Sequence, residues 1–220
     1  AQQVAAELGN MKGALMELGQ MASYLDDGLP EPMRLALAQL QSQAPPMAIE
    51  LVHEVLLAEL GKPLSELFVE FDDEPIAAAS IGQVHRAILR TPEGDRAVAV
   101  KVQYPGVAEA IDADIRTADL LGTLLAFGFK SLNPEDMVAE IKDRLREELD
   151  YSLEAQNQQT FADFYRGHPF IHVPEVLHDY STSRVLITEL VNGSSFAEVL
   201  EWTQQERNDV GEAIFRFVFR

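Results

Sequence analysis

Apolar side chains in the first 25 residues recur at alternating steps of four and three, which places them on one stripe of a helix. The stripe consists of Val4, Leu8, Met11, Leu15, Leu18, Ala22 and Leu25. Further helices are predicted over about 31–43, before Pro45 and Pro46, and over about 47–60, before Gly61. The beginning of the chain is therefore predicted to be an all-helical block.

The pattern changes after Gly61 to short segments rich in β-branched residues, which are typical of strands. Strands are predicted over 67–71, 79–89 and 97–102. The last two are separated by Thr91-Pro92-Glu93-Gly94-Asp95, a turn composition, so they are expected to form an antiparallel hairpin.

Helices and strands then follow one another to the end of the chain. Two helices are predicted over about 107–127 and from Pro134 to about Tyr165, where Asn133 supplies an N-cap. Strands are expected near 176–179 and 184–190, and helices over 196–200 and 204–220. A helical block, a small sheet with helices and further helices predict an α+β fold, and not a doubly wound sheet.

Charge and composition narrow the classes of function. The chain has 220 residues, with 17 Lys and Arg against 36 Asp and Glu, for a formal net charge of −19. This charge argues against nucleic acid as the main partner and disfavours an electrostatic anchor on anionic lipid. The absence of cysteine excludes disulfides and thiolate metal sites, and the five histidines show no helix-spaced ligand pair, so no metal site is predicted.

Two segments of the predicted hairpin carry candidate chemistry. The small residues Ala77, Ala78, Ala79 and Ser80 precede Gly82, and such a loop lets backbone amides approach phosphate oxygens, although an alanine-rich strand packed under a helix has the same composition. Lys101, within Ala97–Gln103, has the placement of the lysine that contacts nucleotide phosphates in protein kinases, and a strand-end lysine that extends to water is the alternative.

Two later segments complete this group. The acidic run Glu147–Asp150 in the predicted long helix could pair a carboxylate with Lys101, or could be an ordinary solvated helix face. Glu189, Leu190 and Val191 end a predicted strand in the manner of a kinase hinge, and an ordinary strand running into a turn is the alternative.

Taken in order, these segments resemble the UbiB/ADCK (aarF-domain) family of atypical kinase-like proteins, which is linked to ubiquinone and prenyl-lipid metabolism. The resemblance is carried by AAASIGQVH, AVKVQYPGV, EELDYSLEA, GHPFIHVPEV and LITELVNG. It implies a protein-kinase-like N-lobe preceded by a helical extension. The corresponding domains are 1–62 for the extension, 63–191 for the N-lobe with inserted helices, and 192–220 for the hinge exit and the start of the C-lobe.

The resemblance also implies roles for individual residues. Ala77, Ala78, Ala79 and Ser80 would form an Ala-rich nucleotide loop with Gln83 in the same binding set, and Lys101 would anchor the phosphates. Glu148 and Asp150 would be a Glu-x-Asp pair, with Glu148 also the partner of Lys101. Glu189, Leu190 and Val191 would be the hinge, and Gln20 the glutamine of a Lys-x-Gly-Gln motif in the extension.

Two departures from the family pattern bear on function. Glu17 stands where the extension motif has lysine, which turns an expected opposite-charge contact into a like-charge one. The catalytic loop and the metal-binding motif of kinases are expected beyond Arg220.

The implied function is binding of ATP or ADP and, with Mg²⁺ in the full-length protein, ATP hydrolysis or phosphoryl transfer to a small molecule. A nucleotide-binding scaffold without phosphoryl transfer is the alternative. A lipid or other small-molecule substrate is an implied partner. The expected location is cytoplasmic, with peripheral membrane contact left open.

Overall fold

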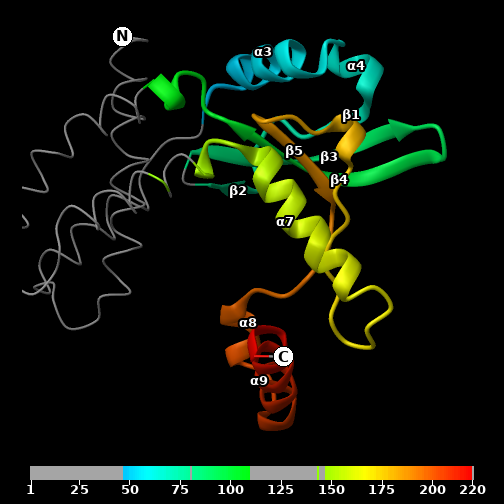
Figure 1. Cartoon of the computed structure of the whole chain (residues 1–220), viewed down its shortest axis with the longest axis vertical. Coiled ribbons are helices and arrows are strands. Elements are labelled where there is room, and N and C mark those ends of the chain that lie inside the picture. Colours follow the sequence, from blue (N-terminus) through cyan, green and yellow to red (C-terminus); the bar gives the residue numbers. More distant parts are fainter. Residues whose placement is uncertain (1–46, 80, 110–142, 144–146, 220) are drawn as a thin grey trace, which may run out of the picture.

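An antiparallel sheet forms the centre of the computed structural model, which describes residues 47–79, 81–109, 143 and 147–219 (Figure 1). The strands are β1 (Phe68–Phe71), β2 (Ala77–Ala78), β3 (Gly82–Thr91), β4 (Gly94–Gln103) and β5 (Val185–Glu189). Their order is β1-β3-β4-β5, and β2 pairs with the other end of β3. The predicted hairpin is confirmed, because Thr91 pairs with Gly94 across a two-residue turn.

Helices cover both faces of this sheet (Figure 1). On one face lie α3 (Ile49–Leu60) and α4 (Leu64–Leu67), and on the other lies α7 (Tyr151–Phe164). The predicted end of α3 is confirmed, since Gly61 adopts a left-handed φ of 69° that a side chain would strain. The chain continues into α8 (Phe196–Leu200) and α9 (Gln204–Phe219), both as predicted.

Side chains alternate between two apolar clusters along the central strands. Val98, Val100 and Val102 of β4 pack toward α3, together with residues of β5 and of α3 itself. Leu186 of β5 packs on the opposite face, in a cluster with Ile81, Val107, Tyr151, Ala155 and Val176. Because neighbours along a strand point to opposite faces, Lys101 lies on the face that α7 covers.

The long helix predicted from Pro134 to Tyr165 is interrupted. Residues 143, 147 and 148 are helical, but the chain leaves the helix at Leu149, and Asp150 is extended with φ −114° and ψ 93°. The Asp150 carboxylate accepts a hydrogen bond of 2.9 Å from the Ser152 N–H and so starts α7 as its N-cap. The Asp150 side chain thus binds a backbone N–H at the beginning of α7, and the helical conformation is broken at Leu149 and Asp150.

The strand predicted near 176–179 is also wrong in part. Val176 forms one isolated bridge with Thr188, and His178–Tyr180 is a 3₁₀ turn. The Ser181 hydroxyl accepts from the Ile187 N–H at 3.0 Å, a bond that a longer neighbouring strand would otherwise make. The helices predicted over 1–25 and 31–43, and most of those over 107–127 and 134–150, lie outside the described residues.

A chain of buried polar groups joins β3 to the beginning of α3. The Met47 N–H donates to Gln83 Oε1 at 2.8 Å, which fixes the orientation of the amide. Gln83 Nε2 then donates to His85 Nε2 at 2.9 Å, and His85 Nδ1 donates to the Asp72 carbonyl at 2.7 Å. His85, fully buried and stacked on Phe71, is therefore the neutral tautomer with its proton on Nδ1.

This arrangement predicts a dependence of stability on pH. Burial is the main cause that lowers the pKa of His85, with His53 acting in the same direction and the Asp72 carbonyl and Asp73 opposing it. The unfolded chain thus binds the proton more readily, and the free energy of unfolding falls as pH drops below the ordinary value of 6.5.

Urea titrations between pH 5 and pH 8 measure the effect. His85 is expected to add up to about 1.4 kcal/mol per pH unit to the slope below its ordinary pKa. His85→Gln should lose this contribution, whereas His178→Gln, at an exposed histidine, should keep it. An unchanged slope in His85→Gln would show that His85 does not titrate differently on folding.

Candidate functional site

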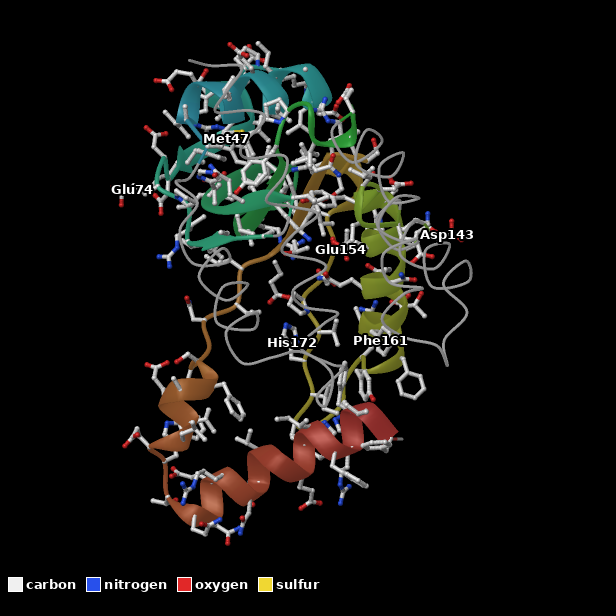
Figure 2. The ribbon with its side chains drawn as sticks, turned by 90° about the vertical axis from the view of Figure 1, so that its left-hand side faces the viewer. Met47, Glu74, Asp143, Glu154, Phe161 and His172 are labelled. Carbon is white, nitrogen blue, oxygen red and sulfur yellow. The ribbon has the colours of Figure 1, made fainter. Side chains whose placement is uncertain are left out.

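An ion pair between β4 and α7 is the centre of the candidate site. Lys101 Nζ donates to Glu154 Oε1 at 2.8 Å and to Oε2 at 2.6 Å. Figure 2 shows Glu154 on the side of α7 that faces the sheet. The lysine side chain is 20% exposed and the glutamate side chain 41%, so the pair lies at the border between the core and solvent.

The predicted pairing of Lys101 with Glu148 is therefore corrected to Glu154. In an uninterrupted helix Glu148 would lie seven residues before Ala155, on the same face. The break at Leu149 and Asp150 takes Glu148 out of that helical frame, and Glu154 lies next to the buried Tyr151 and Ala155. Asp150, predicted to be catalytic, caps α7 in the structure, and its catalytic role stays a prediction.

An aromatic ring lies beneath the lysine. Lys101 Nζ is 4.5 Å from the centroid of the Tyr151 ring, and Tyr151, the first residue of α7, is 1% exposed. Burial is the main cause that raises the pKa of the Tyr151 hydroxyl far above its ordinary value, with Glu154 and Glu148 adding to it, so the hydroxyl stays neutral. Among the described residues this hydroxyl has no hydrogen-bond partner.

Gly82 makes room for that hydroxyl. A Cβ at this position would lie 2.7 Å from the Tyr151 hydroxyl oxygen and 2.3 Å from the Val102 carbonyl oxygen. The φ of Gly82 is not in the left-handed region, so space, and not backbone conformation, requires glycine here. The end of the Ala-rich loop thus rests on Tyr151.

Strand register places three predicted regions around one patch of the sheet. Ala77 pairs with Val84, which pairs with Lys101, so Ala77 and Lys101 share a face about 10 Å apart. Glu189 pairs with Val98, three residues from Lys101 along β4, so its backbone lies about 11 Å from that of Lys101 without sharing its strand face. Ala77 and Ala78 are exposed, and the Ala79 N–H donates to the Gly82 carbonyl at 2.9 Å.

Two cavities lie beside this patch. One of about 500 Å³ borders Ala77 and Ala78, and Gln83 and Tyr104 also line it. The other, of about 590 Å³, lies where Glu189 meets His172 and the end of α7. Lys101 lines neither cavity, so the register and the ion pair, and not a hollow, define the candidate site.

Gln83, predicted to bind nucleotide, has another position. It is 1% exposed and faces α3, and its amide is occupied by Met47 and His85. Strand alternation turns Gln83 away from the face that carries Lys101. Gln83 also borders the cavity beside Ala77 and Ala78, so its role in binding nucleotide stays a prediction.

The predicted hinge begins at the last residue of β5, Glu189. The Leu190 N–H donates to the Ala97 carbonyl at 3.1 Å, and the Glu189 N–H donates to the Glu175 carbonyl at 2.9 Å. The Glu189 carboxylate lies 2.9 Å from His172 Nε2, and Val191 is half exposed. Glu189 and Leu190 are thus held by the sheet, and Val191 is the first of the three to leave it.

The other predicted residues lie outside the described part of the chain, and that part contains neither a candidate metal cluster nor a membrane-spanning helix. Ser80 and Gln20 lie outside the described residues. Within the described ranges, no group of three or more His, Asp or Glu side chains is arranged to hold a metal ion. None of the helices in that part of the chain has the length and hydrophobicity needed to cross a bilayer.

Comparison with known proteins identifies the family. Residues 39–220 match the model of the ABC1 atypical kinase-like domain. The chain belongs to this family. The chain is 39% identical over 212 residues to the mitochondrial atypical kinase coq-8 of Caenorhabditis elegans, and the match covers 94% of this chain and 27% of that protein. It is 34% identical over 211 residues to the mitochondrial atypical kinase COQ8 of Saccharomyces cerevisiae, covering 96% and 42%.

Bacterial proteins are similar to this chain as well. The probable protein kinase UbiB of Marinobacter nauticus is 36% identical over 187 residues, covering 84% of this chain and 34% of that one. A solved structure, Rv3197 of Mycobacterium tuberculosis in complex with erythromycin, has a TM-score of 0.65 and 40% identity, covering 96% of this chain and 53% of that one. The chain thus has a kinase-like fold. It spans between about a quarter and a half of the length of these relatives.

Proposed function

We propose that this chain binds ATP or ADP against the sheet face that carries Lys101. The observation that carries the proposal is the Lys101–Glu154 ion pair, which holds a cation at the edge of the core of a kinase-like sheet. A lysine held in this way by a helix carboxylate contacts the nucleotide phosphates in protein kinases. The names of the relatives, which call them atypical or probable kinases, support the same class of ligand.

The residues present fit a nucleotide. Lys101 would donate to phosphate oxygens, and Glu154 would hold the ammonium in place beside them. The exposed Ala77 and Ala78 would let the backbone of the loop approach the phosphates, and Glu189, Leu190 and Val191 would border the base. Bound ATP would supply the phosphoryl group, with Mg²⁺ neutralising its charge.

The activity of the full-length protein is a further part of the proposal. Mg²⁺-dependent ATP hydrolysis or phosphoryl transfer to a small molecule is the proposed reaction, and a nucleotide-binding scaffold is the second candidate. A lipid or other small-molecule substrate is proposed as partner. Two relatives are named mitochondrial, which does not support the expected cytoplasmic location of this chain. The cytoplasmic location and peripheral membrane contact both stay predictions.

Thermal unfolding of the chain with nucleotide tests the proposal. ATP or ADP with Mg²⁺ at 100 times the dissociation constant should stabilise the native state by about 2.7 kcal/mol, which raises the melting temperature. AMP and inorganic triphosphate at equal ionic strength control for salt and for a base or phosphate acting alone. A melting temperature unmoved by millimolar ATP and by millimolar ADP would contradict nucleotide binding by this chain.

A further inference from the structure

Tyr151 connects three parts of the candidate site, namely α7, Lys101 and Gly82. It begins α7, which carries Glu154. The face of its ring lies 4.5 Å below Lys101 Nζ. A Cβ at Gly82, shortly after the Ala-rich loop, would lie 2.7 Å from the Tyr151 hydroxyl oxygen. Ile81, directly before Gly82, is fully buried in the cluster that contains Tyr151.

The position of the ring is fixed from several sides. The Tyr151 N–H donates to the Ser183 carbonyl at 2.9 Å, which ties the first residue of α7 to the segment before β5. Asp150 caps the same helix through the Ser152 N–H. A ring anchored at its backbone and 1% exposed has little freedom to follow the lysine, so the lysine must adapt to the ring.

The electrostatics at Lys101 favour one direction of the ammonium. Glu154 contacts Nζ through both carboxylate oxygens, and the negative face of the Tyr151 ring lies on another side of the same cation. The hydroxyl, in contrast, forms no hydrogen bond among the described residues, so its polar character does not contribute to holding the lysine.

We propose that Tyr151 is a positioning residue that holds the Lys101 ammonium beside Glu154 through its ring face and supports the Gly82 end of the Ala-rich loop. This inference rests on the proposed nucleotide function, because its consequence for binding is transmitted through Lys101. The ring, and not the hydroxyl, carries the role. Phenylalanine at position 151 should therefore preserve the position of Lys101. Leucine, which is apolar and can be buried but has no aromatic face, should not preserve it.

Two measurements on the 220-residue chain test this role. The first is the dissociation constant of Mg²⁺-ATP in Tyr151→Phe and Tyr151→Leu. Tyr151→Leu should weaken binding about fivefold or more, and Tyr151→Phe should stay within about twofold of the unsubstituted protein. Val107→Ala is the matched control, since it removes apolar volume from the same buried cluster without touching Lys101, and it should leave the affinity unchanged.

The second measurement needs no nucleotide, and its decisive reading comes from the unsubstituted protein, so it does not depend on whether a variant folds. With ¹³C-labelled lysine, the ε-methylene protons of Lys101 should show an upfield ring-current shift in the unsubstituted protein and in Tyr151→Phe, and lose it in Tyr151→Leu. An unsubstituted protein in which Lys101 lacks this shift overturns the inference.

The outcomes separate the inference from the function on which it rests. Absence of ATP binding in the unsubstituted chain, with the ring-current shift present, overturns the proposed function and leaves the position of the lysine established. The role of the ring face is overturned if Tyr151→Leu binds ATP as tightly as the unsubstituted chain. It is also overturned if Tyr151→Phe or Val107→Ala weakens ATP binding as much as Tyr151→Leu does.

Discussion

Replacing Lys101 with alanine is expected to weaken the binding of Mg²⁺-ATP about 10- to 100-fold, the usual consequence of losing hydrogen bonds to a charged group. The fold should be retained. Lys101 lies at the border of the core, and Glu154, 41% exposed, can regain water when its partner is removed. We therefore expect the free energy of unfolding to change by about 1 kcal/mol or less. Isothermal titration calorimetry with equilibrium unfolding measures both quantities.

Arg90→Ala supplies a control for this prediction. Arg90 is exposed near the turn end of β3, lines neither cavity beside the candidate site, and is not among the residues proposed to bind nucleotide. It removes the same charge from the acidic chain and should leave the affinity for ATP unchanged. A folded Lys101→Ala variant that binds as tightly as the unsubstituted protein would remove Lys101 from the site.

Gly82→Ala is expected to destabilise the protein strongly, because among the glycines of the described residues only Gly82 has atoms within 4 Å of an added Cβ. The added Cβ would lie 2.3 Å from the Val102 carbonyl oxygen, which belongs to the paired strand β4 and cannot turn away. It would also meet the Tyr151 hydroxyl at 2.7 Å. We expect a loss of roughly 3 kcal/mol or more, which lowers the melting temperature by about 6 °C or more.

Gly211→Ala is the matched control. Gly211 lies inside α9 with open space around its Cα, so alanine should stabilise this helix by about 0.5–1 kcal/mol. Opposite shifts of the melting temperature in the two variants are the expected result. A melting temperature of Gly82→Ala no lower than that of the unsubstituted protein would mean that the backbone at Gly82 can move away from Tyr151 and Val102.

The sheet could be predicted from the sequence because its signals are local. The turn composition between Thr91 and Asp95 and the β-branched runs on both sides specify the hairpin, and Gly61 marks the end of α3. The kinase-like class followed from the order of several motifs, each of which is common by itself.

The residues that the prediction missed depend on geometry that no single motif carries. Glu154 stood within the motif already singled out, but the choice between Glu148 and Glu154 depends on where the helix begins, and the Asp150 cap decides that. A helix starting at Tyr151 would have indicated that Tyr151 and Ala155 face the sheet with Glu154 between them.

The burial of Gln83 could have been predicted from its strand. Gln83, His85, Ala87 and Leu89 alternate along β3 and are all buried, so the period of two places Gln83 on the core face. The partners of its amide could not be predicted in this way. The polar chain that satisfies it runs to Met47 and to the Asp72 carbonyl, distant in sequence, and only the fold brings these groups together.

The most direct test of nucleotide binding at Lys101 is covalent labelling of the chain with an acyl-phosphate derivative of ATP, which acylates lysines close to the bound phosphates. Mass spectrometry of the digested protein should find the acyl group on Lys101, and excess ADP with Mg²⁺ should protect it. Lys62, at an exposed position beyond the end of α3, serves as the internal reference for untargeted acylation. Labelling of Lys101 no greater than that of Lys62, or unaffected by ADP, would contradict a nucleotide site at Lys101.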